Sequence, residues 1–236
     1  MSRAPVKRVY DNRLRAEQAL ATRSRVVAAA RTEFLSRGYA AVSMGMIAAA
    51  AGVSREMLYK VFGSKAALLK AVYDVTLAGD ADSAAMAERP ELLAIYDDPD
   101  PRSMVARLAA ISADLVGRLG PLFAMISVGA GAGDPDLTEL AAVSGRERLI
   151  GCEMLVRAIA GTGGLRSDLT PDEAADILWT LLSPQVWQLL VDERGWTLDR
   201  YERWLDRSMA DALLSGDRVP DRQGRLSESP PRTDSR

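Results

Sequence analysis

The sequence contains no histidine and only one cysteine, Cys152. Zinc sites of the Cys/His type, histidine-based catalytic triads and a structural intrachain disulfide are therefore excluded. The first 15 residues lack the apolar core of a signal peptide. No run of about 18 apolar residues indicates a membrane span. We therefore expect a protein of the reducing cytoplasm that needs no metal or other cofactor.

Net charge is also small, but it is unevenly distributed. The 236-residue chain has a formal charge of −2 at pH 7. Residues 1–76 contain 13 Lys and Arg against 5 Asp and Glu, a balance of +8, whereas residues 77–236 contain 17 against 27, a balance of −10. Counterion release depends on the charges that face a duplex, so a basic patch at one end favours a nucleic acid partner there. The alternative is an ordinary solvated basic face.

Residues 44–62 have the spacing of a helix, a tight turn and a second helix, with the sequence MGMIAAAAGVSREMLYKVF. Small and apolar residues recur about one helical turn apart, which gives each helix an inner stripe. They are Ile47, Ala48, Ala51, Leu58 and Val61. Gly52 occupies the turn, where a positive φ is needed, and Ser54 follows as an N-cap. The pattern is typical of a helix-turn-helix that binds a DNA major groove, although any small helical hairpin could show it.

The stretch from Arg25 to Val72 resembles the DNA-binding domain of the TetR family of transcriptional regulators almost end to end. The matching residues are Ala29, Ala30, Phe34, Gly38, Tyr39, Ser43, Ile47, Ala48, Ala51, Gly52, Val53, Ser54, Leu58, Tyr59, Phe62, Ser64, Lys65, Leu68 and Leu69. The resemblance implies an all-α, two-domain homodimer that binds a near-palindromic DNA operator. Such a protein is typically a repressor that a small ligand releases from the operator.

The resemblance also implies roles for residues of the second helix of the motif and its surroundings. Arg55, Glu56, Met57 and Lys60 are the candidates for base contacts, and Ser43, Tyr59 and Lys65 are the candidates for phosphate contacts. An alternative for Tyr59 is that it mainly packs against the first helix. Glu56 departs from the small residue often found at its position, which puts close backbone approach to DNA in doubt there.

The chain divides into four predicted parts. Residues 1–15 are expected to be a basic flexible arm, in which Arg3, Lys7 and Arg8 could enter a minor groove. Residues 16–63 form the helix-turn-helix DNA-binding domain, whose first helix spans about 16–37. Residues 64–215 form a larger helical ligand-binding and dimerisation domain, and residues 216–236 a disordered tail with almost no apolar residue. A fourth helix, 64–78, joins the two domains.

Later helices are predicted at 102–119, 122–128, 136–160, 171–191 and 198–214, with Pro184 kinking the fourth of these. Residues 88–101 are expected to be a loop with one helical turn at most. By the family pattern, the last two helices of each subunit pair into a four-helix dimer interface, with an ordinary intrachain core as the alternative. The interface candidates are Leu182, Val186, Leu189, Tyr201, Trp204 and Leu205.

Candidate residues of a ligand pocket are more weakly indicated, and each could equally be a core residue. They are Met104, Leu108, Phe123, Met125, Met154, Trp179 and Trp187. Because methionine fills adaptable cavities and these stretches contain few isolated acids, we expect a small, mostly apolar effector.

Two other hypotheses are weaker. Residues 122–128 followed by glycines at 129, 131 and 133 could be a strand and a phosphate-binding loop of a nucleotide-binding enzyme. Asp134, however, stands where a dinucleotide fingerprint needs its third glycine. The other possibility is a regulator of the same fold that is controlled by a protein partner instead of a small ligand.

Overall fold

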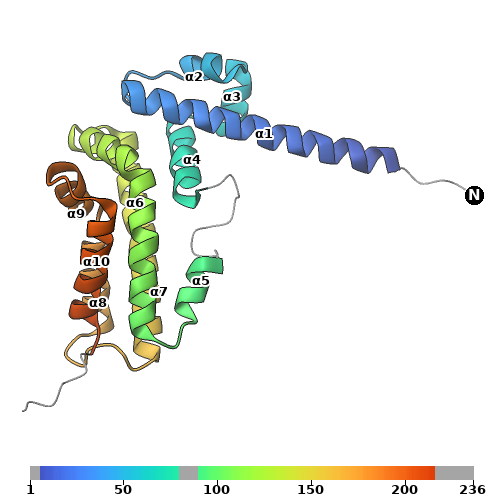
Figure 1. Ribbon diagram of the computed structural model, residues 1–236. Helices are drawn as coiled ribbons and strands as arrows, with labels where there is room; N and C mark the ends of the chain where they lie inside the picture. Colours follow the sequence, from blue (N-terminus) through green and yellow to red (C-terminus); the bar gives the residue numbers. More distant parts are fainter. Residues whose placement is uncertain (1–5, 80–89, 216–236) are drawn as a thin grey trace, which may run out of the picture.

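The protein is all-α over the part of the chain that the computed structural model describes, which is residues 6–79 and 90–215, with side chains from residue 17 onward. The N-terminal helices are α1 (Val6–Arg37), α2 (Met44–Ala51), α3 (Arg55–Phe62) and α4 (Lys65–Ala78). The later elements are α5 (Pro90–Tyr96), α6 (Pro101–Gly131), α7 (Pro135–Gly161), α8 (Pro171–Leu181), α9 (Pro184–Trp187), the π-helix η2 (Gln188–Glu193) and α10 (Leu198–Leu213). Figure 1 shows α1 to α3 at one end of the molecule and the long helices α6, α7 and α10 running away from it.

The first helix is longer than the sequence analysis predicted. It begins at Val6 and not at residue 16, so most of the predicted flexible arm is helical. The reason is local: no glycine or proline follows Pro5 for the length of the helix, and Arg, Ala, Leu, Glu and Gln are good helix formers. Figure 1 shows the N-terminal half of α1 extending away from the other helices. Residues 1–5 of the arm and the predicted tail 216–236 lie outside the described residues.

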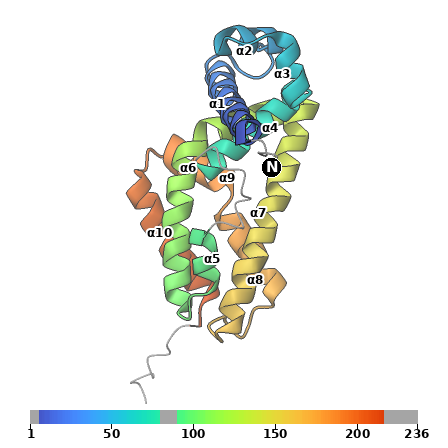
Figure 2. The same cartoon turned by 90° about the vertical axis from the view of Figure 1, so that its right-hand side faces the viewer.

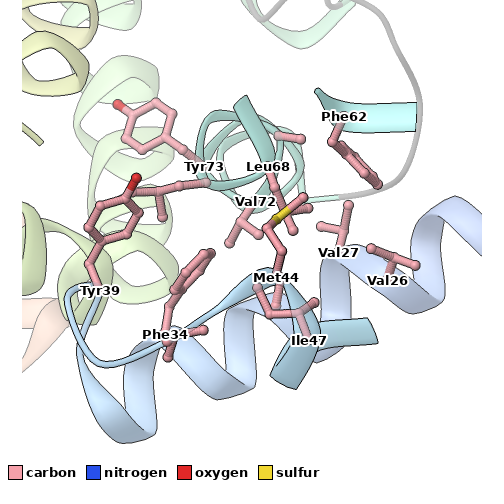
Figure 3. Close-up of a cluster of buried hydrophobic side chains, with 14 of the residues drawn as sticks. Val26, Val27, Phe34, Tyr39, Met44, Ile47, Phe62, Leu68, Val72 and Tyr73 are labelled. Atoms are coloured by element: carbon pink, nitrogen blue, oxygen red, sulfur yellow. The ribbon is translucent and has the colours of Figure 1, made fainter. Parts of the chain in front are cut away.

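One hydrophobic core joins the N-terminal helices to the rest of the molecule. Val26, Ala30 and Phe34 point inward from α1, and each has no exposed surface. Figure 3 shows Phe34 enclosed by side chains from α2 and α4. The same cluster continues into α6 and α7 through Leu119, Leu122, Ile126, Leu137 and Leu140. The N-terminal helices therefore rest on the second domain and do not form a separate core.

The predicted break between residues 119 and 122 does not exist, because α6 runs without interruption through Pro121 to Gly131. Proline inside a helix usually costs stability, but here Pro121 is exposed while Leu119 and Leu122 beside it are fully buried. The packing of the neighbouring leucines thus outweighs the tendency of Pro121 to end the helix. Since residues 122–131 are helical, the hypothesis of a strand followed by a phosphate-binding loop is wrong.

The predicted helix 171–191 is instead three elements. The chain breaks after Leu181, and Ser183 caps α9, its Oγ accepting a hydrogen bond from the Val186 N–H at 3.3 Å. Pro184 is therefore the first residue of α9, a position where the missing N–H and fixed φ of proline do not disturb the helix. The prediction that Pro184 kinks a continuous helix 171–191 is wrong. The helices predicted at 136–160 and 198–214 are present as α7 and α10.

Among the described helices, α6 alone is long and apolar enough to cross a membrane by length and composition. Its apolar face is engaged within the protein, because Met104, Val105 and Ala109 are buried in a second core with α7, α8 and α10. Met104 and Val105 are at most 1% exposed. In this structure α6 is the central helix of a helical domain (Figure 2).

Candidate DNA-binding surface

The turn between α2 and α3 is built by local hydrogen bonds. Gly52 has a φ of 65°, a conformation that disfavours other residues, and the Val53 N–H beyond it donates to Ala48 O at 3.0 Å. The Ser54 side chain then accepts from the Met57 N–H at 3.1 Å and starts α3. Ser43 and Ser64 cap α2 and α4 in the same way, and the N-cap predicted at Ser54 is confirmed.

The first helix holds this motif from behind. The Arg25 guanidinium donates from Nε to Ala51 O at 3.0 Å, at the C-terminal end of α2 where a positive charge is favoured. The Arg23 guanidinium lies 4.9 Å from the centre of the Phe62 ring on α3. Leu58 and Phe62 are buried beneath. Neither arginine could be assigned a role from the sequence, because a basic residue on an exposed helix face has no distinctive pattern.

The outer face of α3 brings together four of the predicted DNA contacts. Arg55, Glu56 and Lys60 are exposed, and Tyr59 is 42% exposed with its ring centre 5.6 Å from the Arg55 guanidinium. The alternative in which Tyr59 mainly packs against α1 is therefore not favoured. Met57 is only half exposed, and it lines an apolar groove between α3 and α1.

Glu56 has a second role at the start of α3. A hydrogen bond from its own backbone N–H, and another from the Ser54 side chain, lower the pKa of the Glu56 carboxyl. The carboxylate is thus ionised at neutral pH and lies at the positive end of the helix, where it favours helix formation. This local contact explains how an acidic residue is accommodated on a surface that otherwise carries positive charge.

Two of the predicted phosphate contacts, Ser43 and Lys65, lie at helix N-termini, and Lys65 already makes a hydrogen bond within the protein. Ser43 is exposed at the start of α2. The Lys65 ammonium, at the start of α4, donates to Tyr39 O at 3.0 Å and lies 4.0 Å from the centre of the Tyr39 ring. An ammonium has three donors, so this contact leaves capacity for a phosphate.

Tyr39 also connects the DNA-binding helices to the second domain. Its hydroxyl donates to Asp136 Oδ2 at 2.5 Å, at the N-terminal end of α7, and burial together with this bond raises the pKa of Tyr39. The Lys70 ammonium on α4 lies 3.2 Å from Glu147 on α7. The Arg118 guanidinium on α6 donates to Thr76 O near the end of α4 at 3.3 Å. Polar contacts thus attach α4 and the turn before α2 to the helices below.

Comparison with known proteins identifies this arrangement. Residues 26–72 match the family model described as bacterial regulatory proteins, tetR family. The N-terminal domain therefore matches the DNA-binding domain of the TetR family. No curated protein matches the sequence.

Solved structures show the same fold over most of the chain. SmeT, the repressor of the Stenotrophomonas maltophilia multidrug efflux pump SmeDEF, superposes in its triclosan complex with a TM-score of 0.63 at 23% identity, covering 90% of this chain and 100% of SmeT. NalD, the secondary repressor of the MexAB-OprM pump of Pseudomonas aeruginosa, gives 0.60 at 22% identity, covering 84% and 98%. A transcriptional regulator from Saccharomonospora viridis in complex with choline gives 0.61 at 20% identity, covering 82% and 98%. At these identities the likeness concerns the fold.

The predicted pocket residues are distributed over two cores. Met104 and Trp187 are buried in the second core, with Leu108 packed against it, whereas Met125 packs against the first core and Phe123 against both. Trp187 approaches α6 so closely that a Cβ at Gly120 would lie 2.1 Å from its ring. Met154 is half exposed, and Trp179 is 37% exposed. Met104 and Trp187 therefore serve the packing of the domain.

The predicted dimer residues also separate into two groups. Tyr201 and Leu205 are 1% and 0% exposed within the single chain, so they are not available to the predicted dimer interface and belong to the second core. Leu182, Val186 and Trp204 are half exposed, and Leu189 is 52% exposed. Apolar surface thus remains exposed along α8, α9, η2 and α10 in the single chain.

Proposed function

We propose that this TetR-family protein is a cytoplasmic transcriptional regulator that binds a near-palindromic operator as a homodimer and acts as a repressor. The observation that carries the proposal is the outer face of α3. Arg55, Tyr59 and Lys60 project from a helix that is capped at its start and held by buried Leu58 behind. A short, rigid helix with long polar side chains fits the major groove, and arginine can bind guanine with two hydrogen bonds.

The apolar surface that is exposed on α8, α9, η2 and α10 supports dimerisation. Leu182, Val186, Leu189 and Trp204 offer apolar area to a second copy of the chain, and a two-fold axis would present two α3 helices to two half-sites. Half-sites in such operators lie about 34–36 Å apart, one turn of DNA. A dimer of this kind explains why an operator should be near-palindromic.

Release by a small, mostly apolar effector is the favoured form of control. The second domain has an aromatic and aliphatic interior, and the triclosan complex of SmeT and the choline complex of the S. viridis regulator show that proteins of this fold hold small molecules. A ligand can act only if it binds more tightly to a dimer arrangement that no longer fits the operator. Control by a protein partner is the second candidate, and an enzymatic function has no support in the fold.

Arg55→Ala should relax the base preference of the protein at one position of each half-site. The loss of a bidentate contact to guanine costs about 1–3 kcal/mol, whereas binding to random DNA should change much less. Competition binding with the selected operator and single-base variants of it measures this effect. Arg146→Ala, which removes an exposed arginine of α7, is the matched control and should change neither affinity. Equal losses on operator and random DNA for Arg55→Ala would remove Arg55 from the base-contacting set.

A further inference from the structure

Arg148 on α7 is a partly buried arginine without an acidic partner. Its Nε atom is buried and makes no hydrogen bond, and within residues 6–79 and 90–215 its guanidinium has no ion pair. The group lies over the ring of Trp179 on α8, with Cζ 4.8 Å from the ring centre. Burial lowers the pKa of Arg148 from its usual value, yet arginine keeps its proton in proteins.

Comparable arginines in the second domain are all paired. Arg107, Arg118 and Arg166 are likewise half exposed, and each has a carboxylate oxygen at 2.6 to 3.4 Å. Their partners are Asp98, Asp114 and Asp168 respectively. Arg148 is therefore the exception among the half-exposed arginines of the described part of this domain.

The groups around Arg148 do not supply the missing negative charge. Burial raises the pKa of the Cys152 thiol, one helical turn further along α7, to about 12, so the thiol is neutral at pH 7. Burial also raises the pKa of the Tyr73 phenol on α4, which stays neutral. The carboxylate next in sequence, Glu147, is held by the Lys70 ammonium at 3.2 Å. The positive charge of Arg148 is thus left beside the neutral Cys152 thiol and Tyr73 phenol.

An unpaired, partly desolvated guanidinium is costly, and proteins keep such a group where something else compensates it. The guanidinium plane can donate two parallel hydrogen bonds to a carboxylate or a similar planar acid. Aromatic side chains lie near it: the guanidinium lies over the Trp179 ring, and the Tyr73 phenol on α4 is close enough to interact with its charge. Tyr73 is in turn in edge contact with Phe123, at 6.1 Å between ring centres. An unpaired guanidinium beside aromatic side chains suits an acid that is carried on an apolar body.

We propose that Arg148 binds the acidic group of the effector, which is a largely apolar, aromatic molecule carrying one carboxylate or similar anion. The inference rests on the proposed ligand-controlled function and specifies its ligand class. Tyr73 lies on α4, and Glu147, the neighbour of Arg148, holds Lys70 on the same helix. An acid bound at Arg148 would therefore act directly beside the helix that carries the DNA-binding domain.

The test uses two fluorescent probes that differ only in their charge. 1-Anilinonaphthalene-8-sulfonate carries a sulfonate, and N-phenyl-1-naphthylamine is the same ring system without it. The full chain should bind the sulfonate probe more tightly in fluorescence titrations. Arg148→Met should weaken that probe about 10-fold to 100-fold, the value of a hydrogen-bonded ion pair, and change the affinity for the neutral probe less than about twofold. Arg146→Met, two residues away and exposed, should change neither affinity.

Thermal unfolding separates this role from a structural one. Removing an uncompensated charge should leave the melting temperature of Arg148→Met unchanged or higher, and Arg148→Lys should retain part of the preference for the sulfonate probe. Equal binding of the two probes by the native chain, binding of neither, or equal loss of both in Arg148→Met would overturn the inference. Operator binding distinguishes the two proposals. If the neutral probe releases the protein from the operator as well as the sulfonate probe does, only the anion site at Arg148 is refuted. If the sulfonate probe binds through Arg148 but does not release the protein from the operator, only control by a ligand is refuted.

Discussion

Phe34→Ala is expected to destabilise the folded protein by about 3–5 kcal/mol. Phe34 has no exposed surface, and its ring centre lies 5.5 Å from that of Tyr39 in the core beneath the helix-turn-helix (Figure 3). Removing the ring leaves a cavity that the surrounding helices can fill only in part. Because this core continues into α6 and α7, we expect one unfolding transition at lower denaturant concentration and not a separate early transition of the DNA-binding helices.

Urea unfolding followed by circular dichroism measures the Phe34→Ala effect. Leu20→Ala on the same helix is the control, since Leu20 is 60% exposed and its removal should change the free energy of unfolding by less than about 0.5 kcal/mol. An early transition that involves only part of the helical signal would contradict a core shared between the domains. A loss as small as that of the control would contradict the burial of Phe34.

Leu189→Arg should separate the dimer into folded monomers and lower operator affinity at least about a hundredfold. Leu189 is 52% exposed in the single chain, so the arginine costs little in folding, but in a dimer it would place a charge in an apolar interface. A monomer binds one half-site and loses the gain from linking two α3 helices, which is about 10²–10⁴ in affinity.

Sedimentation velocity and operator titration test the dimer prediction together. Leu93→Arg is the matched control, because Leu93 is 44% exposed on α5, which lies on the opposite side of the molecule from α8 and α10 (Figure 1). That variant should remain dimeric and bind the operator normally. A native chain that is monomeric at micromolar concentration and still binds a palindrome tightly would contradict the proposed interface.

The N-terminal domain could be predicted from the sequence because its signals are local. Serine caps at 43, 54 and 64 and the glycine at 52 each satisfy backbone groups within a few residues, so their spacing alone fixes the ends of α2, α3 and α4. For the outer face of α3, exposure agrees with the assignment of Arg55, Glu56, Tyr59 and Lys60, while contact with DNA stays a prediction.

The second domain was harder to predict because its elements depend on distant packing. The same residue type, proline, lies within a continuous helix at Pro121 and at the start of a new helix at Pro184, and only the neighbouring side chains decide between the two. The apolar residues of α10 include buried Tyr201 and Leu205 as well as half-exposed Trp204, and the sequence could not tell which of them face inward. Arg148 gave no signal at all, since its isolation from acids appears only in three dimensions.

Selection of bound sequences from a random DNA pool tests the central claim most directly. The native chain should enrich an inverted repeat whose half-sites lie about one helical turn apart, because two α3 helices related by a two-fold axis contact them. The Arg55→Ala protein should enrich the same repeat with one position of each half-site relaxed. Enrichment of no sequence, or of a single site without symmetry, would contradict a dimeric operator-binding regulator.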